Sequence, residues 1–490
     1  MLRRLARHVS NYSVGNLLVT ISGFISFPIF TRIFSVGEYG VLNLISATLG
    51  LLLAISKLGV QHSIVRFYGE VRSGHRDASV SQYLSTTLFG MMAVGLATTV
   101  AWAVVSQSIP TAWWNDPRVA GLFLITAILL FIRTIDSSLV NFLRAEERSG
   151  TLNIYNVAKR YGSLALVLVT LFGVARDLYG YFWATVIAEA IATGVLLAAM
   201  SRTRRFSPRE YSPELFRRML AFGIPMIAFE LSGIVLNIGD RYVIEAMLGS
   251  ESLGVYSAGY NFCQYVQVVF LAALGQAAMP MVVRCWEDKG PDETGRFVRQ
   301  TLHYYLLVAF PLVAGVSAIG GEVLVILASD KYAEGATIIP YVVGGMAVEG
   351  AISILAAGLY IHKRTLIMAA LMASCAVLNV ALNIGLIPGL GIVGAALATL
   401  LAYVALALGA WHAGRKVLPY SVPLVSAAKF ALLSLVMFAI VDSISLSNRW
   451  ASLVAQVLGG TLTYSVLVLL FDQQSRSIVR VLVGRLTQRA

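Results

Sequence analysis

The residues of this sequence that could do chemistry are charged side chains set inside long apolar segments. Glu189, Glu230 and Glu349 lie close to the middles of such segments, and Arg133 lies one helical turn before Asp136. An ionised side chain at the centre of a bilayer costs roughly 2.5–3.5 kcal/mol unless a counter-ion or water compensates it. These side chains are therefore expected to pair with one another or to face a water-filled cavity.

Two interpretations are open for several of these charges. Arg133 can neutralise Asp136 on its own helix, or it can hold a bound anion. Asp240 and Arg241 can form a local ion pair near the end of their segment. A wet cavity or coupling to a cation explains the three glutamates better than structural pairing, because they lie beyond reach of the interface.

The remaining buried or terminal cations are lysines and one arginine. Lys159 and Arg160 lie two turns into their segment, and adjacent residues on a helix point about 100° apart, so both cannot take the shortest route to the interface. Lys57 and Lys429 lie near the ends of apolar helices, and their side chains are expected to extend to the interface.

Sequence motifs of enzymes and metal sites carry little weight here. Gly389–Gly394 spells G-x-G-x-x-G, but no acidic residue follows about 20 positions later and no βαβ unit surrounds it. The spacing of four between Gly391 and Ala395 instead favours close helix packing in lipid. The six histidines are scattered, the three cysteines lie in apolar spans or at an edge, and we expect no metal site, disulfide or catalytic constellation.

The elements that position these charges are membrane-spanning helices. The chain of 490 residues is 58% apolar and 13% charged, with a mean hydropathy of +0.76, so polar surface is too scarce to cover a soluble fold. The net charge of +12 comes from basic residues in the gaps between apolar runs. That distribution is typical of membrane topology and argues against nucleic acid as a partner.

Runs of about 20 mostly apolar residues predict fourteen spanning helices. The runs are Asn11–Thr31, Tyr39–Val60, Gln82–Val105, Val119–Phe142, Leu152–Gly173, Tyr179–Met200, Met219–Met247, Leu253–Met279, Thr301–Gly320, Ala336–Tyr360, Leu366–Ile387, Ile392–Ala413, Val422–Val441 and Ala451–Phe471. The sequence therefore predicts an all-α polytopic membrane protein.

A loose internal sequence repeat predicts a duplicated architecture. The stretch Ile21–Leu42 is repeated loosely by Leu231–Tyr256, with Gly40 corresponding to Gly254. We expect two pseudo-symmetric six-helix bundles, residues 1–205 and 206–418, followed by two additional helices and a tail in residues 419–490.

The distribution of Lys and Arg predicts the orientation. With the N-terminus inside, the inner segments hold 26 of these residues, whereas the outer loops hold only Arg118, Arg176, Lys331 and Arg449. Both termini are therefore expected to be cytoplasmic. The first apolar run is long and lacks a small-residue cleavage pattern, which indicates a retained helix and not a cleaved signal.

Four stretches of the sequence resemble a known family. They are F-P-I-F-T-R-I-F-S-V-G-E-Y-G from Phe27, G-V-Q-H-S-I-V-R-F-Y from Gly59, D-R-Y…L-G-V-Y-S-A-G-Y from Asp240 and N-V-A-L-N-I-G-L-I-P-G-L-G-I-V-G-A-A-L-A-T from Asn379. They resemble the Wzx-like polysaccharide and O-antigen flippases of the multidrug/oligosaccharidyl-lipid/polysaccharide exporter superfamily. The resemblance covers nearly the whole chain and includes a MATE-like plan of two lobes.

This resemblance implies the translocation of undecaprenyl-diphosphate-linked oligosaccharides to the outer leaflet of the bacterial inner membrane, without chemistry and by alternating access. A polysaccharide polymerase and a chain-length regulator are the implied partners, beside membrane lipids. Cations would face the diphosphate, because burying it without them is prohibitive; the candidates are Arg32, Arg66, Arg133, Lys159, Arg160 and Arg241. Coupling to H⁺ or Na⁺, without another cofactor, would involve Glu189, Glu230, Asp240 or Glu349.

Two other classes of function stay open. A cation-coupled exporter of small molecules would need a cavity dominated by the acids Glu189, Glu230 and Glu349. A membrane glycan polymerase or glycosyltransferase would need a sizeable external loop with catalytic residues. The longest predicted external loop, Ser106–Arg118, is short, which disfavours this class.

Overall fold

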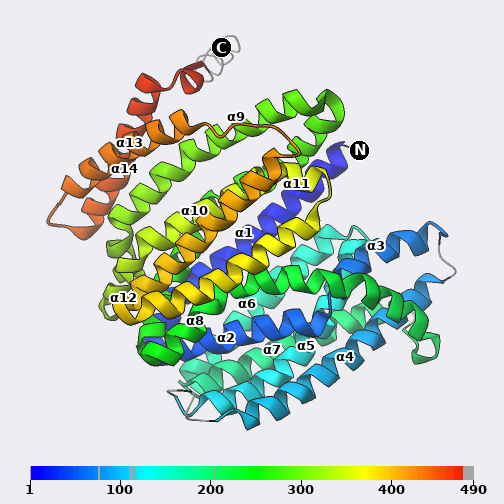
Figure 1. Ribbon diagram of the computed structural model, residues 1–490. Coiled ribbons are helices and arrows are strands. Elements are labelled where there is room, and N and C mark those ends of the chain that lie inside the picture. Colours follow the sequence, from blue (N-terminus) through cyan, green and yellow to red (C-terminus); the bar gives the residue numbers. More distant parts are fainter. Residues whose placement is uncertain (1, 76–77, 111–113, 115, 205, 478–490) are drawn as a thin grey trace, which may run out of the picture. The chain divides into compact units, whose positions relative to one another are not determined.

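The computed structural model describes residues 2–75, 78–110, 114, 116–204 and 206–477, without the side chains of 2–14, 16 and 272–277. Within these residues the regular structure is helical, and Figure 1 shows no strand among them. The elements are α1 (Leu2–Ile33), α2 (Val36–Lys57), α3 (Val60–Arg72), α4 (Val80–Ser108), α5 (Val119–Ala145), α6 (Ser149–Gly173), α7 (Leu178–Ser201), η2 (Pro208–Glu210), α8 (Pro213–Phe270), α9 (Ala272–Ala328), η3 (Asp330–Ile338), α10 (Ile339–Leu355), α11 (Ala357–Ile361), α12 (Thr365–Arg415), α13 (Leu424–Ser443) and α14 (Arg449–Phe471).

The predicted spans all fall on helices, which confirms the all-α membrane fold. Three elements, α8, α9 and α12, are long because each joins two helices across one glycine with positive φ. These glycines are Gly249, Gly290 and Gly391, and each lies between two predicted spans. The interpretation of Gly391 as a packing residue is wrong, because a Cβ there would meet nothing within 4 Å and its φ of +57° marks the break.

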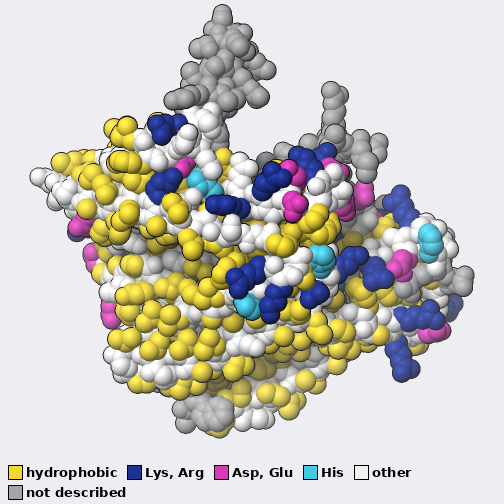
Figure 2. Space-filling view, turned by 45° about the horizontal axis from the view of Figure 1, so that its top comes forward, with side chains coloured by type: hydrophobic (Ala, Val, Ile, Leu, Met, Phe, Trp, Pro, Cys, Tyr) yellow, Lys and Arg dark blue, Asp and Glu magenta, His cyan; other side chains and the backbone are white. Residues whose placement is uncertain are grey.

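Ten helices of the described chain are long and apolar enough to cross a membrane, so the protein is a multi-pass membrane protein. Large apolar side chains cover most of the face drawn in Figure 2, with Lys and Arg gathered in patches. On α7, for example, Ile191 and Val195 are 60% and 64% exposed. Such side chains are stable on a surface only where lipid, and not water, surrounds them.

The helices form two compact units. One contains residues 1–257 and 372–395, and the other contains residues 258–371 and 396–490. In the first unit α5 is central, since α2, α3, α4 and α7 all pack against it. In the second unit α10 and α13 pack against α9, and α14 packs against α13. The units group residues by proximity, so the predicted lobes with boundaries at residues 205 and 418 stay a prediction.

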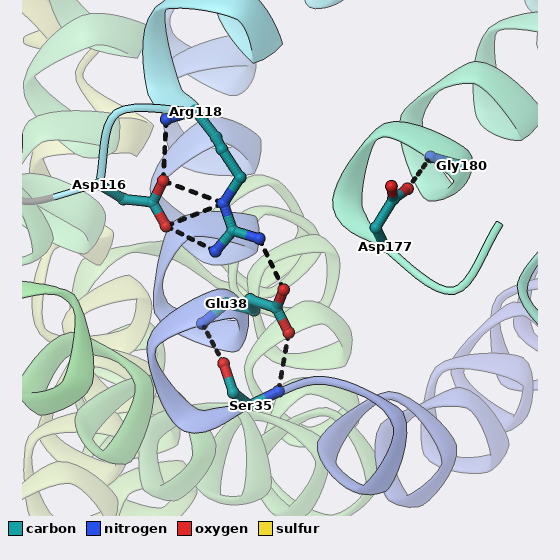
Figure 3. Close-up of polar contacts among 6 residues, drawn as sticks. All are labelled: Ser35, Glu38, Asp116, Arg118, Asp177 and Gly180. Atoms are coloured by element: carbon teal, nitrogen blue, oxygen red, sulfur yellow. Dashed lines mark hydrogen bonds and ion pairs between the residues drawn. The ribbon is translucent and has the colours of Figure 1, made fainter.

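A cluster of hydrogen bonds ties the turn between α1 and α2 to the start of α5 (Figure 3). Ser35 caps α2 by accepting a hydrogen bond from the Glu38 backbone N–H, while the Glu38 carboxylate accepts one from the Ser35 N–H. The Arg118 guanidinium donates to Glu38 at 2.6 Å and to Asp116 at 2.7 Å. These hydrogen bonds from Arg118 hold the pKa of the Asp116 carboxyl below its ordinary value. Arg118 therefore fixes the position of the N-terminal end of α2 relative to the start of α5.

Two glycines bring α2 and α8 into direct backbone contact. A Cβ on Gly40 would lie 2.0 Å from the carbonyl oxygen of Ser250, and a Cβ on Gly254 would lie 2.0 Å from that of Val36. Gly40 thus faces the carbonyl group of Ser250, which lies four residues before Gly254. In the same way, Gly254 faces the carbonyl group of Val36, which lies four residues before Gly40. This reciprocal contact is what a local two-fold axis produces, and it supports the correspondence of Gly40 with Gly254.

A second close contact joins the chain after α2 to the first half of α8. Gly59 has a φ of +69°, and a Cβ on it would lie 2.0 Å from the carbonyl oxygen of Gly223. The residues that follow form α3, so the predicted loop after Val60 begins as a helix. Only glycine satisfies both the backbone conformation and the space at residue 59.

We predict that Gly40→Ala separates α2 from α8, because the new methyl group would overlap backbone atoms that cannot rotate away. In a cysteine-free background, Gly37→Cys with Ser250→Cys provides the reporter, since a Cβ at residue 37 would lie 4.0 Å from that of Ser250. Oxidation should form this disulfide readily in the parent and several-fold more slowly with Gly40→Ala. Gly50→Ala on the same helix meets nothing within 4 Å and is the control. Equal rates in both variants would contradict the prediction.

We predict that Arg118→Gln lowers stability at neutral pH by about 1 kcal/mol, since the pair is partly exposed, or about 2 °C in melting temperature. Asp116 has a lowered pKa, so its contribution is complete above its ordinary value of 3.8 and is lost as the pH falls further. The difference in melting temperature from the parent should thus stay constant from pH 8 to pH 5 and shrink in stronger acid. Exposed Arg176→Gln is the control, and a difference that grows in acid would refute the assignment.

Candidate functional site

A cavity of about 540 Å³, lined mainly by charged and polar side chains, lies in the first compact unit. It is lined by residues of α2, α3, α5, α6 and α8, namely Leu53, Lys57, Gln61, His62, Arg133, Asp136, Ser137, Val140, Asn141, Arg144, Asn156, Lys159, Phe229 and Glu230. Because α2, α5 and α8 have the length and composition of membrane spans, the cavity places charged groups inside a membrane protein.

One face of α5 supplies nearly half of this lining. Arg133, Asp136 and Ser137, Val140 and Asn141, and finally Arg144 follow one another at helical spacings of three and four, which place them in one stripe. The opposite side of α5 carries buried apolar residues such as Leu139 and Phe142. This helix is therefore amphipathic, with its polar stripe directed into the cavity.

Arg133 is paired with Glu189 of α7. Its Nε and Nη2 atoms donate to the two carboxylate oxygens at 2.8 and 2.7 Å, which is the bidentate geometry of an arginine and a carboxylate. The suggested neutralisation of Arg133 by Asp136 is thus not what the structure shows. The carboxylate of Glu189 is only 9% exposed, so it balances Arg133 from behind the cavity wall.

Asp136 is paired with α6. Lys159 Nζ donates to its Oδ2 at 2.5 Å, and the Tyr155 hydroxyl donates to its Oδ1. Lys159 therefore does not extend to the interface, because a carboxylate one helix away compensates its charge. An ammonium group has three donors, so two remain for another ligand.

Two cations of the cavity have no such partner. Among the described residues, no carboxylate lies within ion-pair distance of Lys57 or Arg144; the guanidinium of Arg144 has only the Asn141 amide oxygen, at 3.4 Å. The expectation that Lys57 extends away to the interface is wrong, because it lines the cavity. These two side chains are the positive charges of the cavity that remain available to an anion.

Glu230 of α8 lines the cavity and contacts two residues at the start of α3. Its carboxylate accepts a hydrogen bond of 2.5 Å from the Gln61 amide and lies 3.8 Å from His62 Nε2. It therefore connects α8 to the start of α3 across the cavity. The carboxylates of Asp136, Glu189 and Glu230 carry three negative charges, and the four Lys and Arg residues of the cavity carry four positive charges. Their formal net charge is therefore +1.

The other predicted site residues lie elsewhere. Arg160 donates to Ser22 at 2.8 Å, Arg66 pairs with Glu70 and stacks 4.7 Å from Phe222, and Arg32 donates to the Pro28 carbonyl. Asp240 and Arg241 are buried in α8, and Asp240 accepts a hydrogen bond from Tyr256. Glu349, in the second unit, accepts one of 2.8 Å from Gln267. None of these side chains lines the cavity, and their roles in transport stay predictions.

The sequence contained a signal for the residues that were missed. Asn141 and Arg144 continue the stripe that begins at Arg133, and a polar stripe over three turns of an apolar helix indicates a wet face. Lys57, Gln61, His62 and Asn156 show no such periodicity, so only the fold reveals them. No group of His, Cys, Asp and Glu in the described part of the chain is arranged to hold a metal ion.

Comparison with known proteins identifies relatives. The family described as polysaccharide biosynthesis protein matches residues 5–286, more than half of the chain, and the MatE family matches residues 225–385. The succinoglycan biosynthesis transport protein ExoT of Rhizobium meliloti (strain 1021) is 20% identical over 313 residues, which are 63% of this chain. The aligned part spans 60% of the length of that relative.

Solved structures share the fold. The lipid II flippase MurJ in an inward closed conformation has a TM-score of 0.79 at 15% identity, over 94% of this chain and 99% of that one. An inward-facing multidrug resistance MATE transporter of the MOP superfamily has a TM-score of 0.59 at 14% identity, over 81% and 97%. These two structures show the fold, and the sequence match over residues 5–286 shows that this chain belongs to the polysaccharide biosynthesis protein family.

Proposed function

We propose that this protein is a flippase that carries lipid-linked oligosaccharides across the bacterial inner membrane for the assembly of a surface polysaccharide. The observation that carries the proposal is the cavity with Lys57 and Arg144 uncompensated, in a chain of this family. The relative ExoT is named as a transport protein of polysaccharide biosynthesis, and the structural neighbour MurJ as a lipid II flippase. Both names fit a substrate with a lipid anchor and a sugar.

The chemistry of the cavity suits a diphosphate. An anionic headgroup loses its hydration when it enters a membrane protein, and cations with spare hydrogen-bond donors replace that hydration. Arg144 offers a planar fork of donors, Lys57 offers an ammonium group, and Lys159 keeps two donors. We propose that these three side chains hold the diphosphate of an undecaprenyl-linked oligosaccharide while Asn141 and Asn156 face its sugars.

Transport would follow alternating access, and no covalent bond would be made or broken. An inside-negative potential favours outward movement of an anion by about 2.3 kcal/mol per charge per 100 mV, so the potential alone could drive export. Glu230 and Glu349 have no Arg or Lys at ion-pair distance among the described residues, and they are our candidates for coupling to H⁺ or Na⁺.

A cation-coupled exporter of small molecules is the second candidate. It is less well supported, because Asp136 and Glu189 are occupied by Lys159 and Arg133 and only Glu230 remains to receive a cation in this cavity. The MatE family match at residues 225–385 is the observation in its favour.

The direct experiment uses purified full-length protein in vesicles that contain a fluorescent undecaprenyl-diphosphate oligosaccharide. A membrane-impermeant quencher reports the movement of the sugar between leaflets, and a parallel measurement follows export of a cationic dye. Movement of the lipid-linked sugar above protein-free vesicles supports the proposal. Dye export without sugar movement would replace it with the second candidate.

We predict that Lys57→Gln and Arg144→Gln each lower the initial rate of sugar movement about tenfold, because each removes one charge-assisted contact worth about 1.5 kcal/mol. Melting temperatures should stay within about 1 °C of the parent, since neither residue has a structural counter-ion. Arg144→Lys should keep part of the rate. Arg66→Gln is the control and should leave the rate unchanged, because Arg66 pairs with Glu70 on its own helix and does not line the cavity. Full activity of Arg144→Gln would remove that residue from the site.

We predict that Arg133→Gln lowers stability by about 3 kcal/mol, because it leaves the carboxylate of Glu189 buried without a counter-ion. Adding Glu189→Gln should restore most of the melting temperature, whereas adding Asp136→Asn should not, since Asp136 pairs with Lys159. Thermal unfolding in detergent measures both. Rescue by Asp136→Asn and not by Glu189→Gln would overturn the pairing described above.

A further inference from the structure

An apolar groove of about 310 Å³ runs between α6 and α7 in the first compact unit. On α6 its lining residues follow one face from Tyr155 through Gly162 to Leu166, and on α7 they follow one face from Ala188 to Val195. Small residues form its floor, since a Cβ at Gly162 would meet nothing within 4 Å. The groove is thus a hollow of hydrocarbon character on two helices of a membrane protein.

The walls of this groove face outward. Ile191 and Val195 are 60% and 64% exposed, so their side chains reach the surroundings of the helix pair. From Tyr155 to Leu166 the α6 backbone advances about 16 Å, at roughly 1.5 Å per residue. A groove of that length can accept several isoprene units of an extended chain, and most of its lining residues are apolar.

The inner end of the groove is polar and is shared with the cavity. Lys159 lines both hollows, while Asp136 lines the cavity and Tyr155 lines the groove. The carboxylate of Asp136 accepts hydrogen bonds from both Tyr155 and Lys159, so these three residues form the partition between the hollows. The cavity on one side of this partition is lined by charged residues, and the groove on the other side is mainly apolar. A ligand with a phosphate group joined to a hydrocarbon chain would match both sides.

We propose that this groove binds the polyisoprenoid chain of the lipid whose diphosphate occupies the cavity, with Lys159 at the junction between chain and phosphate. The inference rests on the proposed function and adds the place of the lipid anchor. The groove begins in the first half of α6, which the distribution of Lys and Arg places in the cytoplasmic leaflet. A lipid-linked sugar assembled on the cytoplasmic side would meet the groove there.

Photocrosslinking tests the proposal. A photoreactive benzoylphenylalanine replaces Ile191 on the groove wall, or Val169, which is 64% exposed on α6 but outside the groove. The full-length protein is placed in nanodiscs of phosphatidylethanolamine and phosphatidylglycerol with a small fraction of undecaprenyl-diphosphate oligosaccharide, and adducts are identified by mass spectrometry. The ratio of polyisoprenoid to phospholipid adducts should be at least fivefold higher at residue 191. Equal ratios, or phospholipid adducts alone, would overturn the proposal.

Filling the groove gives a second readout with a matched control. Gly162→Leu should abolish the enrichment at residue 191 and raise the half-saturating concentration of lipid-linked sugar at least fivefold. Gly194→Leu makes the same change on α7, also in open space but outside the groove, and should do neither. If the parent moves sugar but shows no enrichment at residue 191, the groove is wrong and the proposed function stands. If enrichment occurs without any movement of sugar, the groove stands and the flippase function fails.

Discussion

An ionised side chain inside a bilayer must have a counter-ion, water or a ligand, and this constraint organises the first compact unit. Two pairs, Arg133 with Glu189 and Lys159 with Asp136, connect α5 to α7 and α6. Both pairs fix helix positions, but they cancel their own charge. Lys57 and Arg144 differ, because no carboxylate compensates them directly among the described residues. Lys57 is half-buried and Arg144 is exposed at the end of α5, so both are positive charges on the cavity lining that an anionic ligand can reach.

The same unit places close backbone contacts at both ends of α2. Gly40 meets α8 at one end and Gly59 meets it at the other, each where a Cβ would overlap a carbonyl oxygen. The cavity lies beside the second contact, where Glu230 and Gln61 join α8 to α3. If the protein is a flippase, as we propose, alternating access would separate α8 from α2 at one end at a time.

Much of the fold could be predicted from the sequence, because hydrophobic length alone determines a membrane span. Fourteen spans were predicted and fall on helices, and three glycines between them proved to be the breaks in α8, α9 and α12. The site was harder to predict. Arg133, Lys159 and Glu230 do line the cavity, but the partner of Arg133 lies 56 residues away on α7, and sequence spacing shows only neighbours on the same helix. Arg66 and Arg160 have the right chemistry and point elsewhere, since depth in a span does not reveal direction.

We propose that the diphosphate lies between Lys57 and Arg144. A structure of the full-length protein determined by electron microscopy in nanodiscs with an undecaprenyl-diphosphate oligosaccharide tests it most directly. We predict density for the diphosphate within hydrogen-bond distance of Lys57 Nζ and the Arg144 guanidinium, with the Arg133–Glu189 pair intact. Density bound instead at Arg32, Arg66 or Arg241, with the cavity of α5 filled only by water, would contradict the account.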